Sequence, residues 1–592
     1  MDFSSTQRSG VSAMKVDLIL THVVSGRTAA TTVNLVDDLI LGRADVEEYL
    51  GLEEPTISKA HVRLHRIVYE QDKSSISPML YVKSLSRNLT TLVKRSSGSS
   101  TRNIKLHRES TPNLIEHGDI LALSPTVHMQ ITFPNFTTPV LVLNALQRRE
   151  AEAFDDHYLI TKSALGHGGY GAVYMAYEKK SNRQVACKIV DLHHVSRMAC
   201  EEAIDESNRT YKPMHFSEAA QWSAIKTRWQ KRLMKKLDQG YAELAILKDL
   251  SHPNIVGAES AFMSEHTIYI FQEMITGGDL WSYLDTYGRP GLQDADATVI
   301  IKQLIEAVHY LHSHEIVHRD IKPENILINA WEPGGRVVLT DFGLAKRTIT
   351  DQHTGLTRTH RQRMHTAVGT AGYAAPEVQL DNNGDLVETG YTCAVDLWSV
   401  GAITVLLFTS QSVQELFPVE ELHEIDLACL DDADSDDPVA GITMDNDGHY
   451  PFMATCSQRT AIPTTSQKHF SGEADPPNVV GTLVCNLSDL SNAQHDIWGR
   501  IASAPKDFIK RLLVLNECKR MTARQALEHR WLAQPYYKDI LEKVYQKAIT
   551  GWRPRGHAQV ERISAGDIKL APMDDDSILL KMVRDTKSSY FK

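Results

Sequence analysis

The sequence predicts a multidomain protein in which an N-terminal all-β sandwich is followed by a bilobal α+β domain. Three observations predict this fold class. The chain has 592 residues, which is more than one hydrophobic core supports. Short β segments separated by turns fill residues 15–143. From about residue 158, short strands are followed by long amphipathic helical patterns, and this order is typical of an α+β domain.

Composition excludes several classes of protein. Hydrophobic residues at 42% and charged residues at 23% are ordinary for a globular chain. A net charge of −11 gives no support to nucleic-acid or anionic-membrane binding as the main function. The seven cysteines are scattered and never form a CxxC pair, which argues against a disulfide framework and a structural zinc site. No apolar run has the length of a membrane helix, so we expect a cytosolic or nuclear protein with no membrane or direct nucleic-acid partner.

The predicted sandwich occupies residues 15–143, between a flexible tail at residues 1–14 and a polar, helix-compatible linker at residues 144–157. Its β segments are short and regularly spaced, as in a sandwich or barrel. The clearest of them are Val16–Leu20, Val62–Tyr69, Met79–Lys83, Asp119–Leu123 and His128–Phe133.

The α+β domain is predicted at residues 158–535, with insertions near residues 191–240 and 411–490 and a C-terminal tail at residues 536–592. The first insertion ends in a basic helical run, made of Lys226, Arg228, Lys231, Arg232, Lys235 and Lys236. Residues 411–458 of the second contain no Lys or Arg. Solvated loops are the favoured interpretation of both. The alternatives are a nuclear-import or acidic-partner patch for the first, and a docking or phosphorylation loop for the second.

A glycine-rich segment, Leu165–Val173, opens the α+β domain. Gly166, Gly168 and Gly171 form a GxGxxG pattern, which alone also marks Rossmann turns and ordinary hairpins. Glycines allow backbone amides to approach phosphates closely. A Rossmann site requires a helix directly afterwards, whereas Val173–Tyr177 continues as a strand. The pattern therefore favours a flap over the phosphates of ATP.

Lys188 ends a buried apolar strand that begins at Val185. A lysine at such a place supplies a point charge for the α- and β-phosphates, and it needs a carboxylate to hold it. Glu243, on a helical pattern, is the candidate partner. The 55 positions between them are long for such a pair, and the insertion accounts for the excess.

The segment His318–Asn325 gives the strongest single signal. Asp320 can accept the hydroxyl proton of a substrate, and Lys322 can neutralise the transferred phosphoryl group. Asn325 and Asp341, the latter after a hydrophobic strand, offer hard oxygen ligands for Mg²⁺.

The region from about Asp156 to Pro535 resembles the serine/threonine branch of the eukaryotic protein kinases. Ala375–Glu377, Asp396–Gly401 and Arg520, a possible partner of Glu377, complete the motif set. The resemblance implies ATP and Mg²⁺ between two lobes, a hinge at Glu273–Ile275 and a gate residue at Gln272. It assigns catalysis to Asp320, Lys322, Lys188 and Glu243. It assigns the nucleotide site to Leu165, Gly166, Gly168, Gly171, Val173, Ala186, Lys188, Glu273, Ile275, Asp279, Asn325, Leu327 and Asp341.

The N-terminal sandwich resembles a forkhead-associated (FHA) domain. The resemblance rests on Leu41–Arg43, Ser58–His61, Ser86–Thr90 and Gly118–Ile120. In that family, loops at one end of the sandwich bind phosphothreonine. These roles fall on Arg43, Ser58 and Asn88, with Lys59 as a helper and His61 bracing the loops. The family usually has glycine where this chain has Leu89, and a sandwich without a phosphate pocket stays the alternative.

Together the two domains resemble the checkpoint effector kinases of DNA-damage and meiotic recombination signalling. One FHA domain and only Thr6-Gln7 as an N-terminal TQ site are closest to the single-FHA fungal members, including the meiosis-specific ones. The resemblance implies a nuclear protein that can also occur in the cytoplasm. It also implies phosphothreonine-containing adaptor proteins as partners and phosphorylation-dependent homodimers. The rival interpretation is a phosphothreonine-binding scaffold with an inactive kinase domain, although no catalytic position is missing.

Two further expectations concern substrates and switching. Glu324 and Asp279 place carboxylates where related kinases receive the peptide, so we expect arginine three residues before the target Ser or Thr. Thr366 lies where related kinases carry an activating phosphate, and Arg319 is a suitable partner for that phosphate.

Overall fold

In a computed structural model, the chain forms two compact units. Unit 1 contains residues 1–250, 257–278 and 555–592, and unit 2 contains residues 251–256 and 279–554. The structure describes residues 14–35, 38–67, 78–95, 101–134, 143–168, 171–210, 218–287, 291–330, 334–348, 370, 372–378, 391–411, 413, 496–514, 516–533 and 535–563.

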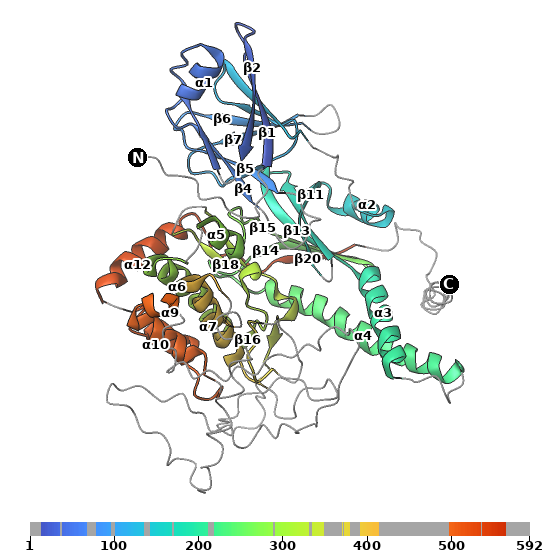
Figure 1. Cartoon of the computed structure of the whole chain (residues 1–592). Helices are drawn as coiled ribbons and strands as arrows, with labels where there is room; N and C mark the ends of the chain where they lie inside the picture. The colour runs from blue at the N-terminus through green and yellow to red at the C-terminus, as the bar shows by residue number, and fades with distance from the viewer. Residues whose placement is uncertain are drawn as a thin grey trace, which may run out of the picture. The chain divides into compact units, whose positions relative to one another are not determined.

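Unit 1 begins with a β-sandwich (Figure 1). Its larger sheet has the order β2-β1-β10-β9-β6-β7, and its smaller sheet has the order β3-β4-β5-β8. The strands are β1 (Met14–His22), β2 (Thr28–Leu35), β3 (Asp38–Leu41), β4 (Val62–Ile67), β5 (Met79–Ser84), β6 (Thr90–Arg95), β7 (Thr101–Leu106), β8 (Asn113–Ile115), β9 (Ile120–Ala122) and β10 (Val127–Thr132). All pairings between them are antiparallel. The predicted all-β sandwich ahead of the α+β domain is confirmed.

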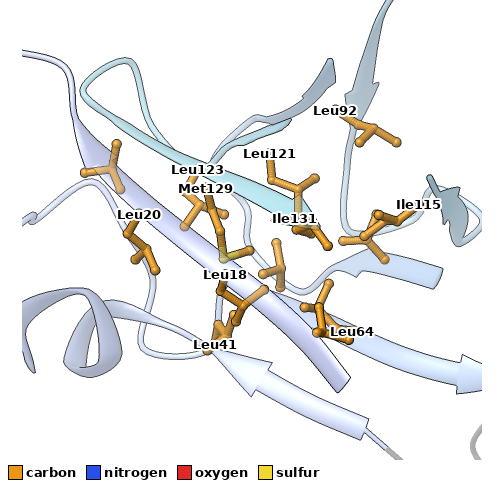
Figure 2. Packing of buried hydrophobic residues seen from close by; sticks show 14 of the residues in the cluster. Leu18, Leu20, Leu41, Leu64, Leu92, Ile115, Leu121, Leu123, Met129 and Ile131 are labelled. Atoms are coloured by element: carbon orange, nitrogen blue, oxygen red, sulfur yellow. The ribbon is translucent and has the colours of Figure 1, made fainter. Parts of the chain in front are cut away.

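The sandwich core lies between the two sheets (Figure 2). Strand β1, which contains the predicted segment Val16–Leu20, buries every second residue, Val16, Leu18 and Leu20. Leu64 from the smaller sheet and Ile131 from the larger belong to the same cluster. Burial of one face of each sheet fixes the register of the strands, because a slip by one residue would turn the apolar face to solvent.

The linker between the two predicted domains is folded. Helix α2 (Ala145–Ala151) and the short helix η1 (Glu152–Phe154) lead into the next sheet. Phe154 is 1% exposed and contacts Phe262, Tyr269 and Phe271. The linker is polar in composition, so the sequence did not reveal that Phe154 is a core residue that anchors it.

The second sheet of unit 1 has the order β11-β12-β13-β15-β14-β20. Its strands are β11 (Tyr158–Gly168), β12 (Gly171–Glu178), β13 (Arg183–Asp191), β14 (Ala258–Met263), β15 (Thr267–Glu273) and β20 (Gln559–Arg562). The last strand comes from the segment that the sequence analysis treated as a tail. That segment is folded as far as residue 563.

Residues 191–240 are not a loop, as the favoured interpretation had it. Helices α3 (Leu192–Thr210) and α4 (Glu218–Leu247) occupy them. The two helices lie side by side (Figure 1). Ala199, Ala203 and Trp229 form a small apolar core between them, and Trp229 Nε1 donates to the Ser196 carbonyl at 3.2 Å. The sequence did not reveal this core, because the two helices are highly charged and their apolar residues are few and widely spaced.

Unit 2 is mainly helical. Its elements are α5 (Leu280–Tyr287), α6 (Asp294–Ser313), β16 (Ile316–Val317), η2 (Pro323–Asn325), β17 (Ile326–Ile328), β18 (Val337–Leu339), η3 (Phe342–Leu344), β19 (Lys346–Arg347), α7 (Ala394–Thr409), α9 (Asp496–Arg500), α10 (Ser503–Leu512), α11 (Ala523–Glu528) and α12 (Pro535–Ala548). All sixteen residues of α7 are buried, which makes it the central helix of the unit. Of the helices within the described ranges, none is long and apolar enough to cross a membrane.

Candidate functional site

Lys188 and Glu243 form an ion pair in unit 1. Lys188 Nζ lies 2.6 Å from Glu243 Oε1, and the two side chains are 17% and 3% exposed. Lys188 comes from β13 and Glu243 from the last turns of α4. Low exposure strengthens the attraction relative to a surface pair and fixes the ammonium group in place. The carboxylate thus positions a cation that can bind phosphate oxygens.

The glycine-rich segment is a β-hairpin. Strands β11 and β12 pair directly through it, with Gly168 opposite Gly171 and Gly166 opposite Val173. A strand, not a helix, follows the glycines, so the Rossmann alternative is wrong. Val173 also pairs with Lys188 on the next strand, which joins the hairpin to the ion pair. Leu165, Val173 and Ala186 are all half-buried.

The predicted hinge begins at the end of β15. Glu273 is the last residue of that strand, 8% exposed, and its Oε1 accepts from the Gly257 amide at 3.2 Å. Ile275 follows and is buried. Gln272, the predicted gate residue, pairs with Ala186 of β13. These residues therefore lie on the same sheet as Lys188.

Asp320, Lys322, Asn325 and Thr370 form a polar cluster in unit 2. Asp320 Oδ2 lies 3.0 Å from Lys322 Nζ, and Thr370 donates to Asp320 Oδ1 at 2.7 Å. Lys322 Nζ donates to Thr370 Oγ1 at 3.0 Å, which closes a triangle. Asn325 Nδ2 donates to the Asp320 carbonyl at 2.8 Å and to Oδ2 at 3.0 Å. The carboxylate thus contacts three side chains, one of which is the Lys322 cation.

The donor set of unit 2 fits a divalent cation. Asn325 uses its amide nitrogen on Asp320, so its amide oxygen points the other way. Asp341 lies one residue after Thr340, whose amide donates to the Asn325 carbonyl at 2.8 Å. Mg²⁺ binds one or two protein oxygens and takes its other ligands from water and phosphates. Within the described ranges, no group of three or more His, Cys, Asp or Glu side chains could hold a metal. A site shared with phosphate oxygens suits this set.

Asp341 adopts an unusual backbone conformation. Its φ is +60°, in the left-handed region that costs free energy for residues other than glycine. It is the N-cap residue of η3, two residues after the end of β18. Arg319 has a φ of +70°. Arg319 directly precedes Asp320, and Asp341 is itself a candidate metal ligand. Both left-handed residues therefore lie at candidate functional positions, where backbone strain is often found.

Asp396 fixes the backbone of the two residues that precede Asp320. It is fully buried, and its carboxylate accepts from the backbone amides of His318 at 2.9 Å and Arg319 at 2.8 Å. His312 Nε2 lies 2.9 Å from the same carboxylate. Burial raises the pKa of Asp396, but the His312 hydrogen bond and the nearby positive charges outweigh it and lower the pKa overall.

The Asp396–His312 pair predicts a pH-dependent stability. Burial lowers the pKa of His312, but the bond to Asp396 outweighs it and raises the pKa to about 9, from an ordinary value of 6.5. Stability from a raised histidine pKa is complete below about pH 6.5 and is lost as pH rises through about 9. Wild type should lose about 3 kcal/mol of unfolding free energy across this window.

Urea unfolding from pH 6 to pH 10 measures this effect. In His312→Gln, which keeps a donor but cannot be charged, the pH dependence should flatten. Parallel profiles for wild type and His312→Gln would contradict the role of His312.

Arg520 and Glu377 form the predicted pair, which is confirmed. Arg520 Nη1 and Nη2 lie 2.6 and 2.9 Å from the two Glu377 carboxylate oxygens. The arginine side chain is 0% exposed and also donates to the Ala394 carbonyl at 2.9 Å. Its guanidinium lies 5.1 Å from the Trp398 ring centre. The pair ties the segment after Thr370 to the helical core.

The loops at one end of the sandwich bring three of the predicted phosphopeptide residues together. Arg43 Nε donates to the Ile57 carbonyl at 2.9 Å. Ser58 Oγ lies 2.7 Å from Ser86 Oγ, which accepts from the Asn88 amide at 2.9 Å. Asn88 Nδ2 in turn donates to the Thr56 carbonyl. Arg43 and Asn88 thus both contact residues 55–57, the segment directly before Ser58.

The remaining sandwich residues define the surroundings of these loops. Lys59 is exposed, and its carbonyl lies so close to Gly42 that any side chain at Gly42 would collide with it. His61 is 0% exposed, accepts from the Ser58 amide at 3.0 Å and contacts Thr90, so it braces the loops. Leu89 is not among the described residues with positive φ, so the turn does not require glycine there.

Other predicted residues fall in different surroundings. Asp279 is 5% exposed, and its side chain accepts from the Ser282 amide at 2.7 Å. Leu327 forms a β-bridge with Asp279. Glu324 is exposed, which makes it the more accessible carboxylate of the two. Thr366 and residues 414–490 of the acidic insertion lie outside the described residues.

The sequence analysis missed the contacts of Thr370 and His312. It assigned no contact to Thr370, although the residue bonds both Asp320 and Lys322. His312 gave no signal, because one histidine at the end of an amphipathic helix is common on protein surfaces. The sequence analysis included Asp396–Gly401 in the motif set but did not predict what Asp396 contacts.

This combination of a glycine-rich hairpin, a lysine–glutamate pair and an Asp320–Lys322–Asn325 segment defines a phosphotransferase. The model of the protein kinase domain matches residues 209–532, more than half of the chain, and the chain belongs to this family. The match begins inside the inserted helices. Lys188 precedes it, and the bond to Glu243 joins the two parts.

Three relatives cover most of the chain. It is 27% identical to the meiosis-specific serine/threonine-protein kinase MEK1 of Saccharomyces cerevisiae, over 89% of this chain and 86% of that protein. It is 26% identical to the meiosis-specific kinase mek1 of Schizosaccharomyces pombe, over 91% and 90%. It is 25% identical to the serine/threonine-protein kinase chk-2 of Caenorhabditis elegans, over 93% and 90%. The chain is a protein serine/threonine kinase, and the inactive alternative finds no support.

Proposed function

We propose that the chain uses Mg²⁺ and ATP to phosphorylate serine and threonine in checkpoint signalling, in meiosis or after DNA damage, and that phosphothreonine recognition recruits it. The observation that carries the catalytic part is the Asp320 cluster. A carboxylate held by Asn325 and Thr370 beside the Lys322 ammonium can accept the substrate hydroxyl proton, while the cation stabilises the charge on the phosphoryl group.

The family implies ATP and a divalent metal ion as cofactors. Asn325 and Asp341 would hold Mg²⁺, and Lys188, fixed by Glu243, would bind phosphate oxygens. The metal would neutralise charge on the phosphates. Glu273, Ile275 and the half-buried side chains of Leu165, Val173 and Ala186 would receive the adenine, with Asp279 and Leu327 beside it. Glu324, exposed in unit 2, would select arginine three residues before the target.

The phosphothreonine part rests on the sandwich loops. Arg43 and Asn88 contact the short segment directly before Ser58, and guanidinium, amide and hydroxyl groups are those that bind phosphate in proteins. Lys59 is exposed beside them and could add a charge. The ligand would be a phosphothreonine of an adaptor protein, or of a second copy of this chain in a phosphorylation-dependent homodimer. The relatives with meiotic names favour a nuclear, meiotic setting.

Arg43→Ala tests the recruitment. The variant should bind a phosphothreonine peptide about 30-fold more weakly, because charge-assisted bonds to the phosphate are lost. Arg43→Lys should recover only part of the affinity, since lysine lacks the planar fork of donors. Fluorescence anisotropy with a phosphorylated and an unphosphorylated peptide measures both. Arg108→Ala, which removes an exposed charge from the same domain, is the control and should bind normally.

The same variant separates recruitment from catalysis. Tethering kinase domains together raises their effective concentration to about the millimolar range and speeds phosphorylation between copies. Arg43→Ala should therefore lower phosphorylation of Thr366 in cells but leave the activity of phosphorylated enzyme unchanged. Normal Thr366 phosphorylation despite lost peptide binding would contradict the connection.

A further inference from the structure

Residues 555–563 return to unit 1 after α12 has ended in unit 2. Their strand, β20, pairs in parallel with β14, with Gln559 opposite Ser260 and Arg562 opposite Met263. It covers the edge of the sheet that carries Lys188. An exposed strand edge is a template for pairing with other chains, and here the chain's own tail occupies it.

Apolar anchoring of this tail lies just outside the strand, where Ala558 is buried and Ile563 packs against the core of the sheet. All four side chains of β20 are exposed. Backbone bonds hold it at both ends: the Ala558 amide donates to the Lys248 carbonyl at 3.0 Å, and the Ile563 amide donates to the Met263 carbonyl at 2.8 Å. Lys248 directly follows α4, the helix that carries Glu243. The tail thus joins the end of that helix to the sheet.

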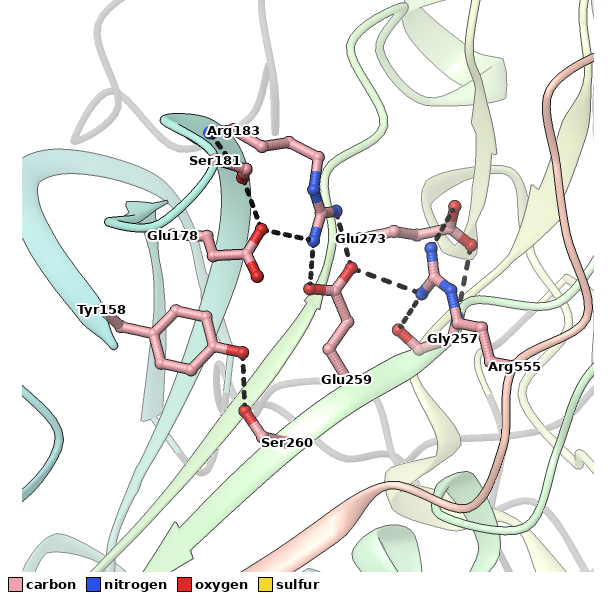
Figure 3. Close-up of polar contacts among 9 residues, drawn as sticks. All are labelled: Tyr158, Glu178, Ser181, Arg183, Gly257, Glu259, Ser260, Glu273 and Arg555. Atoms are coloured by element: carbon pink, nitrogen blue, oxygen red, sulfur yellow. Dashed lines mark hydrogen bonds and ion pairs between the residues drawn. The ribbon is translucent and has the colours of Figure 1, made fainter. Parts of the chain in front are cut away.

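Arg555 makes the most specific contacts of the tail (Figure 3). Its guanidinium donates to the Gly257 carbonyl at 3.1 Å and lies 3.4 Å from Glu273 Oε2 and 3.5 Å from Glu259 Oε1. Glu259 is already held by Arg183, at 2.7 and 2.6 Å. The arginine therefore lies between two carboxylates and is 28% exposed.

Gly257 makes room for this arginine. A Cβ at Gly257 would collide with the Arg555 guanidinium, and no backbone atom is among its nearest neighbours. Gly257 and Glu273 also bond to each other twice, because the Gly257 amide donates to Glu273 Oε1 and the Glu273 amide donates to the Gly257 carbonyl, each at 3.2 Å. Arg555 binds both partners and closes a three-residue ring at the start of the predicted hinge.

We propose that Arg555 is a positioning residue for the nucleotide: the tail segment 555–563 clamps Gly257 to Glu273 and thereby fixes the hinge that receives the adenine. The inference rests on the proposed function in that Glu273 is taken to begin the ATP hinge. The partner that fits the acidic edge formed by Glu259 and Glu273 is the chain's own arginine.

The test compares Arg555→Ala, Arg555→Lys and Gly257→Ala in the full chain, with Arg553→Ala as the control, since Arg553 is an exposed arginine two residues away. In Arg555→Ala, both the KM for ATP and the Kd for Mg·ADP should rise about five- to tenfold, less than the full contribution of one charge-assisted hydrogen bond, because Arg555 acts on the nucleotide only through Glu273. The KM for peptide and kcat should stay within about twofold. Arg555→Lys should restore part of the affinity, and Arg553→Ala should behave as wild type.

A double-mutant cycle separates positioning from general loss of structure. Gly257→Ala should weaken Mg·ADP binding as Arg555→Ala does, and the double variant should be no worse than either single one, because both changes break the same contact. Additive effects, or a fall in kcat with an unchanged nucleotide affinity, would overturn the proposal. Mg·ADP binding is measured without turnover, so it tests the clamp even if the enzyme transfers no phosphate. A wild-type protein that bound nucleotide normally but lacked kinase activity would contradict the proposed function alone.

Discussion

Asp320→Asn is expected to lower phosphoryl transfer about 10²–10⁴-fold, the usual contribution of a positioned general base. The asparagine keeps the shape of the side chain but cannot accept the hydroxyl proton of the substrate. The Asn325 bond to the backbone carbonyl of residue 320 does not involve the side chain and is retained. The variant should therefore fold and bind nucleotide normally while losing turnover.

Single-turnover phosphorylation of a peptide, together with Mg·ADP binding and thermal melting, separates these effects. Asp539→Asn, a change of the same size at an exposed carboxylate, serves as the control and should keep full activity. A folded Asp320→Asn enzyme with near-wild-type turnover would show that the proton acceptor is a different residue.

Arg520→Met should lower the free energy of unfolding by about 3–5 kcal/mol, because it leaves Glu377 without its buried partner. The arginine is 0% exposed and also donates to the Ala394 and Val514 carbonyls, which would lose those bonds. For a unit of this size the melting temperature should fall by roughly 6–20 °C.

The matched control is Arg524→Met. Arg524 pairs with Glu528 at 3.2 Å, but the two side chains are 79% and 65% exposed. Solvent screens that pair, so its loss should change stability by less than about 0.5 kcal/mol. Differential scanning calorimetry of both variants provides the comparison. Equal shifts for the buried and the exposed pair would contradict the importance of burial.

The sequence predicted well those elements whose pattern is set by residues close together in the chain. The predicted strand Val16–Leu20 lies within β1, and α6 is one of the long amphipathic helices expected after residue 158. The kinase motifs indicated Glu377 and Arg520 as partners across 143 positions, and the structure pairs them. A fixed order of motifs determines such a pair even when the intervening chain is unknown.

Other features depend on tertiary contacts that no local pattern records. Helices α3 and α4 are highly charged, and only Trp229 and a few small residues show that they pack on each other. The strand β20 exposes all its side chains, so it has no apolar alternation to detect, and its existence depends on the free edge of β14. Arg555 and Gly257 lie almost 300 positions apart, and neither belongs to a motif.

The central claim is that Asp320, Asn325 and Asp341 make unit 2 a catalytic unit for Mg²⁺-dependent phosphoryl transfer. The most direct measurement is an in vitro kinase assay on a degenerate peptide library with wild type and Asp341→Ala. Wild type should phosphorylate serine and threonine peptides, with arginine favoured three residues before the target. Asp341→Ala, which loses a carboxylate ligand for the metal, should be slower by orders of magnitude at the same ATP and Mg²⁺ concentrations. A folded Asp341→Ala protein with wild-type turnover, or a wild-type protein that transfers no phosphate to any peptide, would contradict the claim.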